Sequence, residues 1–335
     1  MSSNGKTLIF SKKPSILSYA SVAGKKESEG PLGHCFDICG TDALFGEDSF
    51  EKAESKLQKL AVQKALEKGG LKSGNIDCIF AGDLLNQCIG SSFGLMDFNI
   101  SFCGLYGACS TMALSLINAA IYIEAGVAQK TISVTSSHFC SAERQYRFPL
   151  EYGSQRTPSA QWTVTGSGAV VLGGEKGSAY IDRATVGKIC DLGVKDANNM
   201  GAAMAPAAAD TISRFLKDTA TKPTDYDAIF TGDLGFVGSE LLYEILEKDG
   251  IDIKSVHNDC GMMIFDRESQ DVHAGGSGCG CSASVLTGYI LKEIEKGNLS
   301  NVLFCATGAL LSPTSTMQGE SIPCIAHLVN IKKAD

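Results

Sequence analysis

An internal repeat is the feature of this sequence that most constrains its fold. The stretch Ile76–Leu84 reads IDCIFAGDL and Tyr226–Leu234 reads YDAIFTGDL, so each half carries a short apolar run followed by Gly-Asp. Further along, uncharged helical patterns open with GACS at Gly107–Ser110 and with GCSA at Gly280–Ala283. Several matching segments in the same order indicate a duplicated structural unit, which has to be recognised before a fold is assigned.

Helical and strand patterns alternate in the same order in both halves. The predicted elements are helix Ser49–Gly69, strand Ile76–Ala81, helix Gly107–Gly126 and strand Thr131–Ser136, then helix Ala207–Lys217, strand Tyr226–Thr231, helix Cys281–Lys296 and strand Val302–Ala306. This order predicts an α/β fold with helices on the faces of a parallel sheet. We place the two halves at residues 1–183 and 184–335, with a long polar and aromatic loop at about 143–165 in the first.

The composition is that of a soluble globular protein, with 44% hydrophobic and 20% charged residues and a net charge of -8. This charge gives no support for nucleic-acid binding, which usually leaves a basic footprint. Two uncharged stretches, Phe98–Ile123 and Ala274–Leu291, are rich in Gly, Ser, Cys and Asn, so they predict buried central helices and not membrane spans. The 13 cysteines include no CxxC pair and follow no signal peptide, so we interpret most as small buried residues in a reducing cytosol, without a metal site.

Cys109 is the candidate for a chemically special cysteine, because it lies where the buried helix of the first half begins. Backbone N–H groups at a helix N-terminus favour a thiolate over a thiol. The same N–H groups can hold an oxyanion or a bound carboxylate. The position therefore predicts either a reactive nucleophile or part of an anion-binding pocket.

A GACS turn that opens the buried helix of a duplicated βαβαβ core resembles the thiolase superfamily, which includes the ketoacyl synthases. GSGAVVL at Gly166–Leu172 is similar to the strand that closes the first half of those proteins. The resemblance covers nearly the whole chain and implies a layered α/β/α/β/α core, with Cys109 as the acyl-accepting nucleophile. The second half departs from that pattern, because Phe230–Ser239 has no histidine and Gly275–Cys281 has no asparagine.

Two histidines are candidate partners for the cysteine. His138 follows the strand that should end beside Cys109, and His273 directly precedes the glycine-rich turn. Each is either a replacement for the missing catalytic histidine or a hydrogen-bonded structural residue. Removing one well-placed donor typically costs about 10²–10³ in rate, so the missing residues favour binding over condensation.

Three longer strings carry a narrower resemblance: FAGDLLNQ at Phe80–Gln87, RTPSAQWTVTGSGA at Arg156–Ala169 and HAGGSGCGCSA at His273–Ala283. They resemble the stage V sporulation protein AD family of endospore-forming bacteria. That resemblance implies a thiolase-like fold that binds dipicolinic acid (pyridine-2,6-dicarboxylate), alone or as its calcium chelate, without condensing activity or a cofactor. It further implies action with SpoVA membrane proteins that move dipicolinate into the developing spore, and a cytoplasmic protein peripheral to the spore inner membrane. Homodimers are common in the thiolase superfamily.

A flat dianion needs N–H donors or cations for two carboxylates and close-fitting walls for its ring. The expected ligand-binding residues are Cys109, Ser110, Asp83, Asn86, Asp233, His273, Gly276 and Gly278. Arg144, Arg147 and Arg156 are either clamps for a carboxylate or solvated loop charges.

Asp83 and Asp233 occupy equivalent positions of the repeat and would repel a dianion as carboxylates. Each either fixes a turn or caps a helix, or binds ligand through calcium. Two other functions stay open at this point. One is an acyltransferase that uses Cys109 with His138 or His273, and the other is an assembly role with a vestigial pocket.

Overall fold

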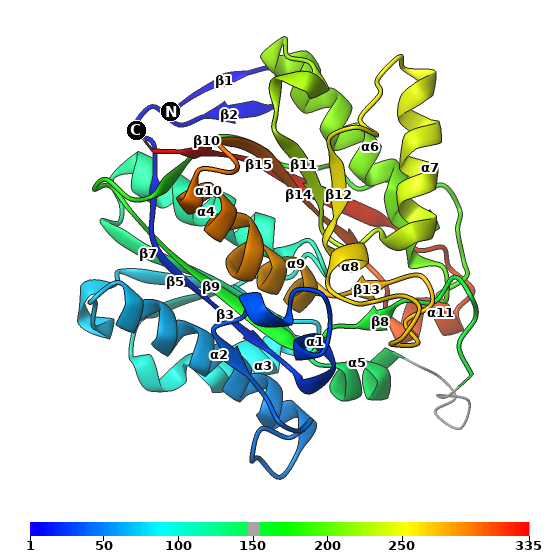
Figure 1. Cartoon of the computed structure of the whole chain (residues 1–335), viewed down its shortest axis with the longest axis horizontal. Coiled ribbons are helices and arrows are strands. Elements are labelled where there is room, and N and C mark those ends of the chain that lie inside the picture. The colour runs from blue at the N-terminus through cyan, green and yellow to red at the C-terminus, as the bar shows by residue number, and fades with distance from the viewer. Residues whose placement is uncertain (147–154, 335) are drawn as a thin grey trace.

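The computed structural model describes residues 1–146 and 155–334, and Figure 1 shows sheets and helices stacked in layers. Within these residues, one hydrogen-bonded path connects ten strands in the order β12-β11-β14-β15-β10-β3-β9-β7-β5-β6. The first-half strands are β3 (Ser15–Ala23), β5 (Cys78–Gly82), β6 (Ser101–Gly104), β7 (Lys130–Ser137) and β9 (Gly166–Gly173). The second-half strands are β11 (Ala228–Thr231), β12 (His257–Asp259), β14 (Asn301–Ala309) and β15 (Cys324–Lys333), together with β10 (Ala179–Thr185), which spans the boundary that we placed between residues 183 and 184.

The duplication is visible in the strand order. Outward from the centre, β3-β9-β7-β5-β6 on one side matches β10-β15-β14-β11-β12 on the other. Strands β5, β6 and β7 are mutually parallel, as are β11, β12 and β14, whereas β9 and β15 run antiparallel to their neighbours. The predicted parallel sheet is therefore wrong in detail, because each half has a mixed sheet whose inner strands run antiparallel.

Helices form three layers around these strands (Figure 1). On the outside, α2 (Phe50–Lys68) packs on the first-half strands and α6 (Met200–Thr219) on the second-half strands, with α3 (Ile89–Leu95) against α2 and α7 (Gly235–Lys248) against α6. Between the sheets lie α4 (Thr111–Ala125) and α9 (Cys279–Val285), which continues through a π-helical turn (Leu286–Ile290) into α10 (Leu291–Lys296). Helix α9 belongs to the second half but packs on β9, β7 and β3, and α4 of the first half also contacts β14 and β15.

Shorter elements complete the described fold. They are β1 (Ser2–Asn4), β2 (Thr7–Ile9), α1 (Lys25–Ser28), β4 (Ile38–Cys39), α5 (Phe139–Tyr146), β8 (Trp162–Thr163), α8 (Cys260–Met263), β13 (Gly276–Ser277) and α11 (Pro313–Met317). Strand β8 pairs with β13, so the two halves also meet here. The predicted loop at about 143–165 therefore contains the end of α5 and strand β8, and residues 147–154 lie outside the described part of the chain.

Local sequence signals account for several helix ends. Ser49 caps α2 by accepting a hydrogen bond from the Lys52 N–H at 3.3 Å. Gly126 and Gly297 end α4 and α10 with φ of 74° and 84°, the left-handed conformation that glycine adopts without strain. The segment Ala108–Ala125 is long and apolar enough to cross a membrane, but 72% of it is buried within the fold. The prediction of a buried central helix is thus confirmed.

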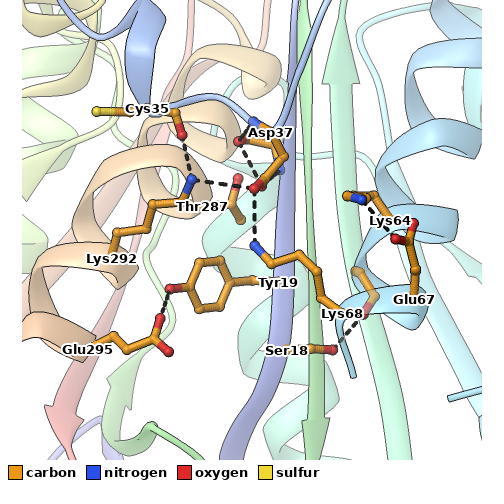
Figure 2. Close-up of polar contacts among 12 residues, drawn as sticks. Ser18, Tyr19, Cys35, Asp37, Lys64, Glu67, Lys68, Thr287, Lys292 and Glu295 are labelled. Carbon is orange, nitrogen blue, oxygen red and sulfur yellow. Dashed lines mark hydrogen bonds and ion pairs between the residues drawn. The ribbon is translucent and has the colours of Figure 1, made fainter. Parts of the chain in front are cut away.

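A polar cluster joins the halves on the side of β3 (Figure 2). The Asp37 carboxylate accepts hydrogen bonds from Lys68 of α2 at 3.1 Å and from Lys292 of α10 at 3.4 Å. The Tyr19 hydroxyl donates to Glu295 at 2.5 Å. Burial opposes ionisation of Asp37, but the backbone N–H of Ser21 and the two lysines outweigh it and lower the pKa of Asp37. The cluster therefore ties α10 to the first half.

Candidate functional site

A cavity of about 490 Å³ lies between the two halves, and Cys109 forms part of its wall. The first half lines it with Leu84, Tyr106, Ala108, Cys109, Ala142, Glu143, Tyr146, Gln155, Ala160, Gln161 and Thr163, and the second with Ala197, Asn198, Met200, Ser277, Ala309, Leu311, Pro313, Thr316 and Met317. We call it the Cys109 cavity. Its size and its mainly apolar wall with a few polar groups are typical of a small-molecule site.

The turn before α4 places Cys109 in this wall. Ala108 has a φ of 49°, an uncommon left-handed conformation for a residue other than glycine, asparagine or aspartate. The turn closes through hydrogen bonds from the Ser110 N–H and hydroxyl to the Gly107 carbonyl, at 3.1 and 2.6 Å. Ser110 is fully buried in this turn, outside the cavity wall. The strained turn therefore presents Cys109 at the cavity and uses Ser110 for support.

The Asp233 carboxylate of the second half lies next to Cys109 of the first half. It accepts hydrogen bonds from the Gly278 N–H at 2.9 Å and the Thr307 hydroxyl at 2.7 Å. The same carboxyl group interacts electrostatically with the Cys109 thiol, and this interaction contributes to the raised pKa of Cys109. Three residues expected to share a site, Cys109, Asp233 and Gly278, are thus brought together, and Thr307 joins them without having been predicted.

This arrangement keeps the thiol protonated. Burial, followed by the negative charge of Asp233, raises the pKa of Cys109 well above its usual value. Burial and the Asp233 carboxylate thus oppose the predicted preference of this helix N-terminus for the thiolate. Burial also raises the pKa of Asp233 to about 7, against the lowering effect of its hydrogen bonds from Gly278 and Thr307.

Asp83 has a different role from its counterpart in the repeat. Its carboxylate accepts hydrogen bonds from the Leu85 N–H at 2.9 Å, and from the N–H and hydroxyl of Ser91 at 2.7 and 2.6 Å. It therefore fixes the turn after β5 and the start of α3, as its structural interpretation predicts. Asp83 does not line the Cys109 cavity.

Two more expected ligand residues stand outside the cavity wall. Asn86 is exposed, and its backbone N–H donates to Gln145 at 2.9 Å. Gly276 lies in β13, where its carbonyl accepts a hydrogen bond from the Gln161 side chain at 2.9 Å. Gly278 lies at φ 107°, and a Cβ there would stand 2.5 Å from the Ser137 hydroxyl oxygen, so only glycine fits.

His138 bonds to backbone groups through both ring nitrogens. Its Nε2 donates to the Ala43 carbonyl at 2.7 Å, and its Nδ1 accepts from the Cys140 N–H at 3.1 Å. Burial lowers the pKa of His138, so the ring is neutral, which suits one donating and one accepting nitrogen. The ring is thus fully used in holding the chain at the start of α5, and the structure does not pair it with Cys109.

His273 contacts a surface cluster near the first-half loop. Its Nδ1 hydrogen-bonds to the Thr157 carbonyl at 2.7 Å and its Nε2 lies 3.0 Å from Asp271. Arg156 donates to the same Asp271 carboxylate at 2.8 Å, so His273 and Arg156 share a partner away from Cys109. Of the other two arginines considered as carboxylate clamps, Arg144 pairs with Glu51. Arg147 lies outside the described residues.

Sequence reasoning missed the polar groups of the wall. The Gln161 amide donates to the carbonyls of Asp233 at 2.7 Å and Gly276 at 2.9 Å, so it joins the halves beside the cavity. The Tyr146 hydroxyl donates to the Leu84 carbonyl and lies 3.2 Å from the Tyr106 hydroxyl. Gln161 and Tyr146 both fall in the predicted loop at about 143–165, whose aromatic and polar composition was the available signal.

The described residues of the wall differ in charge from an anion clamp built of lysine and arginine. Among the described lining residues there is no lysine, arginine or histidine, and Glu143 is the one carboxylate. Across residues 1–146 and 155–334, no group of three or more His, Cys, Asp or Glu side chains is arranged to hold a metal ion. Within the described part of the wall, neutral hydroxyl, amide and backbone groups therefore provide donors for a ligand.

Comparisons with known proteins agree on family and fold. The model of the family stage V sporulation protein AD matches residues 4–332. Stage V sporulation protein AD of Bacillus subtilis (strain 168) is 45% identical over 328 residues, which cover 98% of this chain and 97% of that protein.

Among solved structures, 3-oxoacyl-[acyl-carrier-protein] synthase III of Aquifex aeolicus VF5 is similar at a TM-score of 0.58 and 12% identity, covering 95% of this chain and 99% of that one. Cerulenin-bound OleA of Xanthomonas campestris is similar at a TM-score of 0.60 and 13% identity, covering 99% of this chain and 100% of that one. These similarities establish the thiolase-like fold that the resemblance of the GACS turn and the Gly166–Leu172 strand implies. The chain belongs to the stage V sporulation protein AD family, a sporulation protein family with a thiolase-like fold.

Proposed function

We propose that this sporulation protein binds dipicolinic acid in the Cys109 cavity and does not condense acyl groups. The observation that carries the proposal is the contact between Cys109 and Asp233. A condensing enzyme needs a thiolate and a base that accepts its proton. Here burial and a carboxylate raise the pKa of the thiol, and the ring nitrogens of His138 and His273 bond elsewhere.

The cavity wall supports a small, flat, polar-edged ligand. Ala108, Ala142, Ala160 and Ala309 give it short apolar side chains, against which an aromatic ring can lie closely. Hydroxyl groups of Thr163 and other lining residues supply donors to carboxylate oxygens.

Charge balance favours a ligand whose negative charge is partly neutralised. Asp233 lies next to Cys109, so a free dianion would meet negative charge when Asp233 is ionised. Two routes reduce this repulsion: protonation of Asp233, whose pKa is about 7, and entry of dipicolinate as its calcium chelate, with calcium as part of the cargo. We therefore expect affinity to be higher at pH 6 than at pH 8 in the absence of calcium.

Calorimetric titration with dipicolinate, with and without calcium, tests the proposal on the wild type, on Cys109→Ala and on Cys39→Ala as a matched control. Cys39 is exposed and lies outside the Cys109 cavity. We expect binding by the wild type and Cys39→Ala, and an altered affinity for Cys109→Ala. No heat of binding under either condition would refute dipicolinate binding and leave the assembly role.

The alternative function is a Cys109-dependent acyltransferase, favoured by the position of Cys109 at the start of α4 in a fold shared with condensing enzymes. Mass spectrometry after incubation with acyl-CoA separates the two functions. We expect no adduct on Cys109. A stable acyl group on Cys109 would refute a purely binding role.

We further propose that the protein acts with SpoVA membrane proteins at the spore inner membrane, as a peripheral cytoplasmic component. Exposed apolar side chains support docking: Met317, which lines the Cys109 cavity, is 67% exposed, and elsewhere on the surface Ile189 and Leu192 are 64% and 74% exposed. Co-purification of SpoVA proteins with the wild type but not with a Leu192→Asp variant is the expected result.

Homodimer formation is a separate proposal, supported by the open edge of the sheet. Among residues 1–146 and 155–334, strand β6 pairs only with β5, and Phe102 on β6 is 42% exposed. Exposed strand edges with apolar side chains are templates for pairing with another chain. Sedimentation equilibrium should give a dimer for the wild type and a monomer for Phe102→Lys, and a wild-type monomer would refute this.

A further inference from the structure

The two copies of the repeat hold their Gly-Asp turns in different ways. In the first half, Asp83 itself accepts a hydrogen bond at 2.9 Å from the Leu85 N–H, two residues further along. In the second half the equivalent N–H, that of Gly235, donates at 2.9 Å to Asp259. The carboxyl group of Asp233 is therefore not needed to hold its own turn.

The register of the edge strands explains this difference. In the second half, β12 pairs with β11 so that Asp259 lies opposite Thr231. In the first half, β6 pairs with β5 so that Gly104 lies opposite Ala81. Thr231 and Ala81 are equivalent positions of the repeat. Gly104 is therefore the counterpart of Asp259, and because glycine has no side chain, Asp83 holds the first turn instead.

Asp259 is buried, and each oxygen of its carboxylate accepts two hydrogen bonds. Its Oδ2 accepts from the Thr231 hydroxyl at 2.6 Å and from the Leu234 N–H at 2.8 Å. Its Oδ1 accepts from the Gly235 N–H at 2.9 Å and from an N–H of α8 at 3.1 Å. The donors from the turn come from both sides of Asp233, so a single carboxylate fixes the chain before and after it.

A chain of donors ends on the same carboxylate. The Tyr243 hydroxyl oxygen lies 2.8 Å from His257 Nδ1, and His257 Nε2 lies 2.9 Å from the Thr231 hydroxyl oxygen. Thr231 gives its own hydrogen to Asp259, so its oxygen accepts from His257 Nε2. His257 Nδ1 then accepts from Tyr243. Burial lowers the pKa of His257 to about 4, which keeps the ring neutral, as this arrangement requires. Every hydrogen of the chain points towards Asp259, so this carboxylate is the terminal acceptor.

We propose that Asp259 is the positioning residue for the interaction between Asp233 and Cys109. It holds the turn after β11 from the edge strand, and this leaves the Asp233 carboxyl group to face the other half. The negative charge of Asp259 also favours the protonated form of Asp233. The importance of the pair for dipicolinate rests on the proposed function, whereas the positioning concerns the protein without a ligand.

A double-mutant cycle on the alkylation of Cys109 tests this role. Peptide mass spectrometry gives the rate of Cys109 modification by iodoacetamide at pH 8 in the wild type, Asp259→Asn, Asp233→Asn and the double variant. At this pH Asp233, whose pKa is about 7, is ionised in the wild type and opposes formation of the thiolate.

Asp259→Asn places an NH2 group where an oxygen accepted two hydrogen bonds, so the turn should shift and carry Asp233 away from Cys109. The alkylation rate should rise about tenfold, the effect of a thiol pKa lower by about one. In the Asp233→Asn background the same substitution should change the rate by less than about twofold, because a residue that acts through Asp233 has no effect without its carboxylate.

Urea unfolding of the same proteins separates positioning from stability. Asp259→Asn should lower the free energy of unfolding in both backgrounds, since buried N–H groups lose an acceptor. Asp37→Asn is the matched control, because it removes an acceptor of the Ser21 N–H far from this turn, and it should leave Cys109 alkylation unchanged. If Asp259→Asn does not fold, Thr231→Val takes its place and should give a smaller increase of about threefold, again absent with Asp233→Asn.

Two results would overturn the proposal. An unchanged alkylation rate in folded Asp259→Asn would show that Asp259 does not place Asp233. An equal increase in both backgrounds would show a general loosening of the fold and not an action through Asp233. Calorimetric titration of the wild type with dipicolinate decides the proposed function separately, because the alkylation rates are measured without ligand.

Discussion

Asp233→Asn tests whether Asp233 is a buried carboxyl group that holds its proton up to about pH 7. The substitution keeps an oxygen that can accept the Gly278 N–H and removes the ionisable group. Burial raises the pKa of this carboxyl from 3.8 to about 7. At about 1.4 kcal/mol for each pKa unit, the folded state becomes less stable by roughly 4 kcal/mol, as an upper estimate, when Asp233 ionises.

The sign of the pH dependence follows from proton binding. Between pH 3.8 and about 7 the folded state holds the Asp233 proton and the unfolded state does not, so stability from this group falls as pH rises through that window. Above the folded-state pKa the loss is complete. In Asp233→Asn this contribution is absent, so the decrease in unfolding free energy from pH 5 to pH 8 should be smaller than in the wild type.

Urea unfolding followed by circular dichroism at pH 5, 6, 7 and 8 measures this difference. Asp196→Asn, an exposed aspartate, is the control and should retain the wild-type slope. Burial also raises the pKa of Glu27 to about 7, so the wild-type slope has more than one source and the comparison rests on its change. Identical slopes for Asp233→Asn and the wild type would refute the assignment of a buried, proton-holding carboxyl group.

Three further predictions concern the same region. Gly278→Ala should lower the free energy of unfolding by about 2 kcal/mol or more, because the new Cβ would lie 2.5 Å from the Ser137 hydroxyl oxygen and the φ of residue 278 is 107°. An unchanged midpoint of urea unfolding would contradict this. His138→Phe should lower the free energy of unfolding by about 1–3 kcal/mol, because the Ala43 carbonyl and the Cys140 N–H lose their partners. Dipicolinate affinity should stay within a factor of two of the wild-type value. Abolished binding in a folded variant would give His138 a direct role in binding. Iodoacetamide at pH 8 should label exposed Cys39 well before Cys109, because burial and the Asp233 carboxylate raise the pKa of Cys109. Peptide mass spectrometry over time gives the order of labelling. Labelling of Cys109 before Cys39 would show a reactive thiolate.

Much of the fold follows from local sequence signals. Ser49 and Gly126 fix the ends of two helices through capping and left-handed geometry, and the predicted bounds agree with α2 closely. The helix predicted at Ala207–Lys217 begins earlier, at Met200, and includes Pro206. Asn199 caps it by accepting the Ala202 N–H at 3.3 Å, so the cap, not the proline, sets where the helix starts.

The site itself was only partly predictable. The repeat correctly indicated a cavity between the halves, with Cys109 in its wall. It also suggested equivalent roles for Asp83 and Asp233. Asp83 bonds within its own half, to Ser91, whereas Asp233 also interacts with Cys109 of the other half. This difference depends on which donors lie nearby in space, such as Thr307, and no local pattern in the sequence encodes such distances.

The crossed packing of the central helices has a consequence for how the chain can be divided. Helix α9 of the second half packs on β9 and β7 of the first, and α4 of the first half contacts β14 and β15 of the second. A half-molecule would therefore expose the apolar faces that the other half normally covers, and would have no complete core of its own. Despite its origin in a repeat, the protein is one cooperative unit, and neither half is an autonomous module that can be exchanged, truncated or expressed alone.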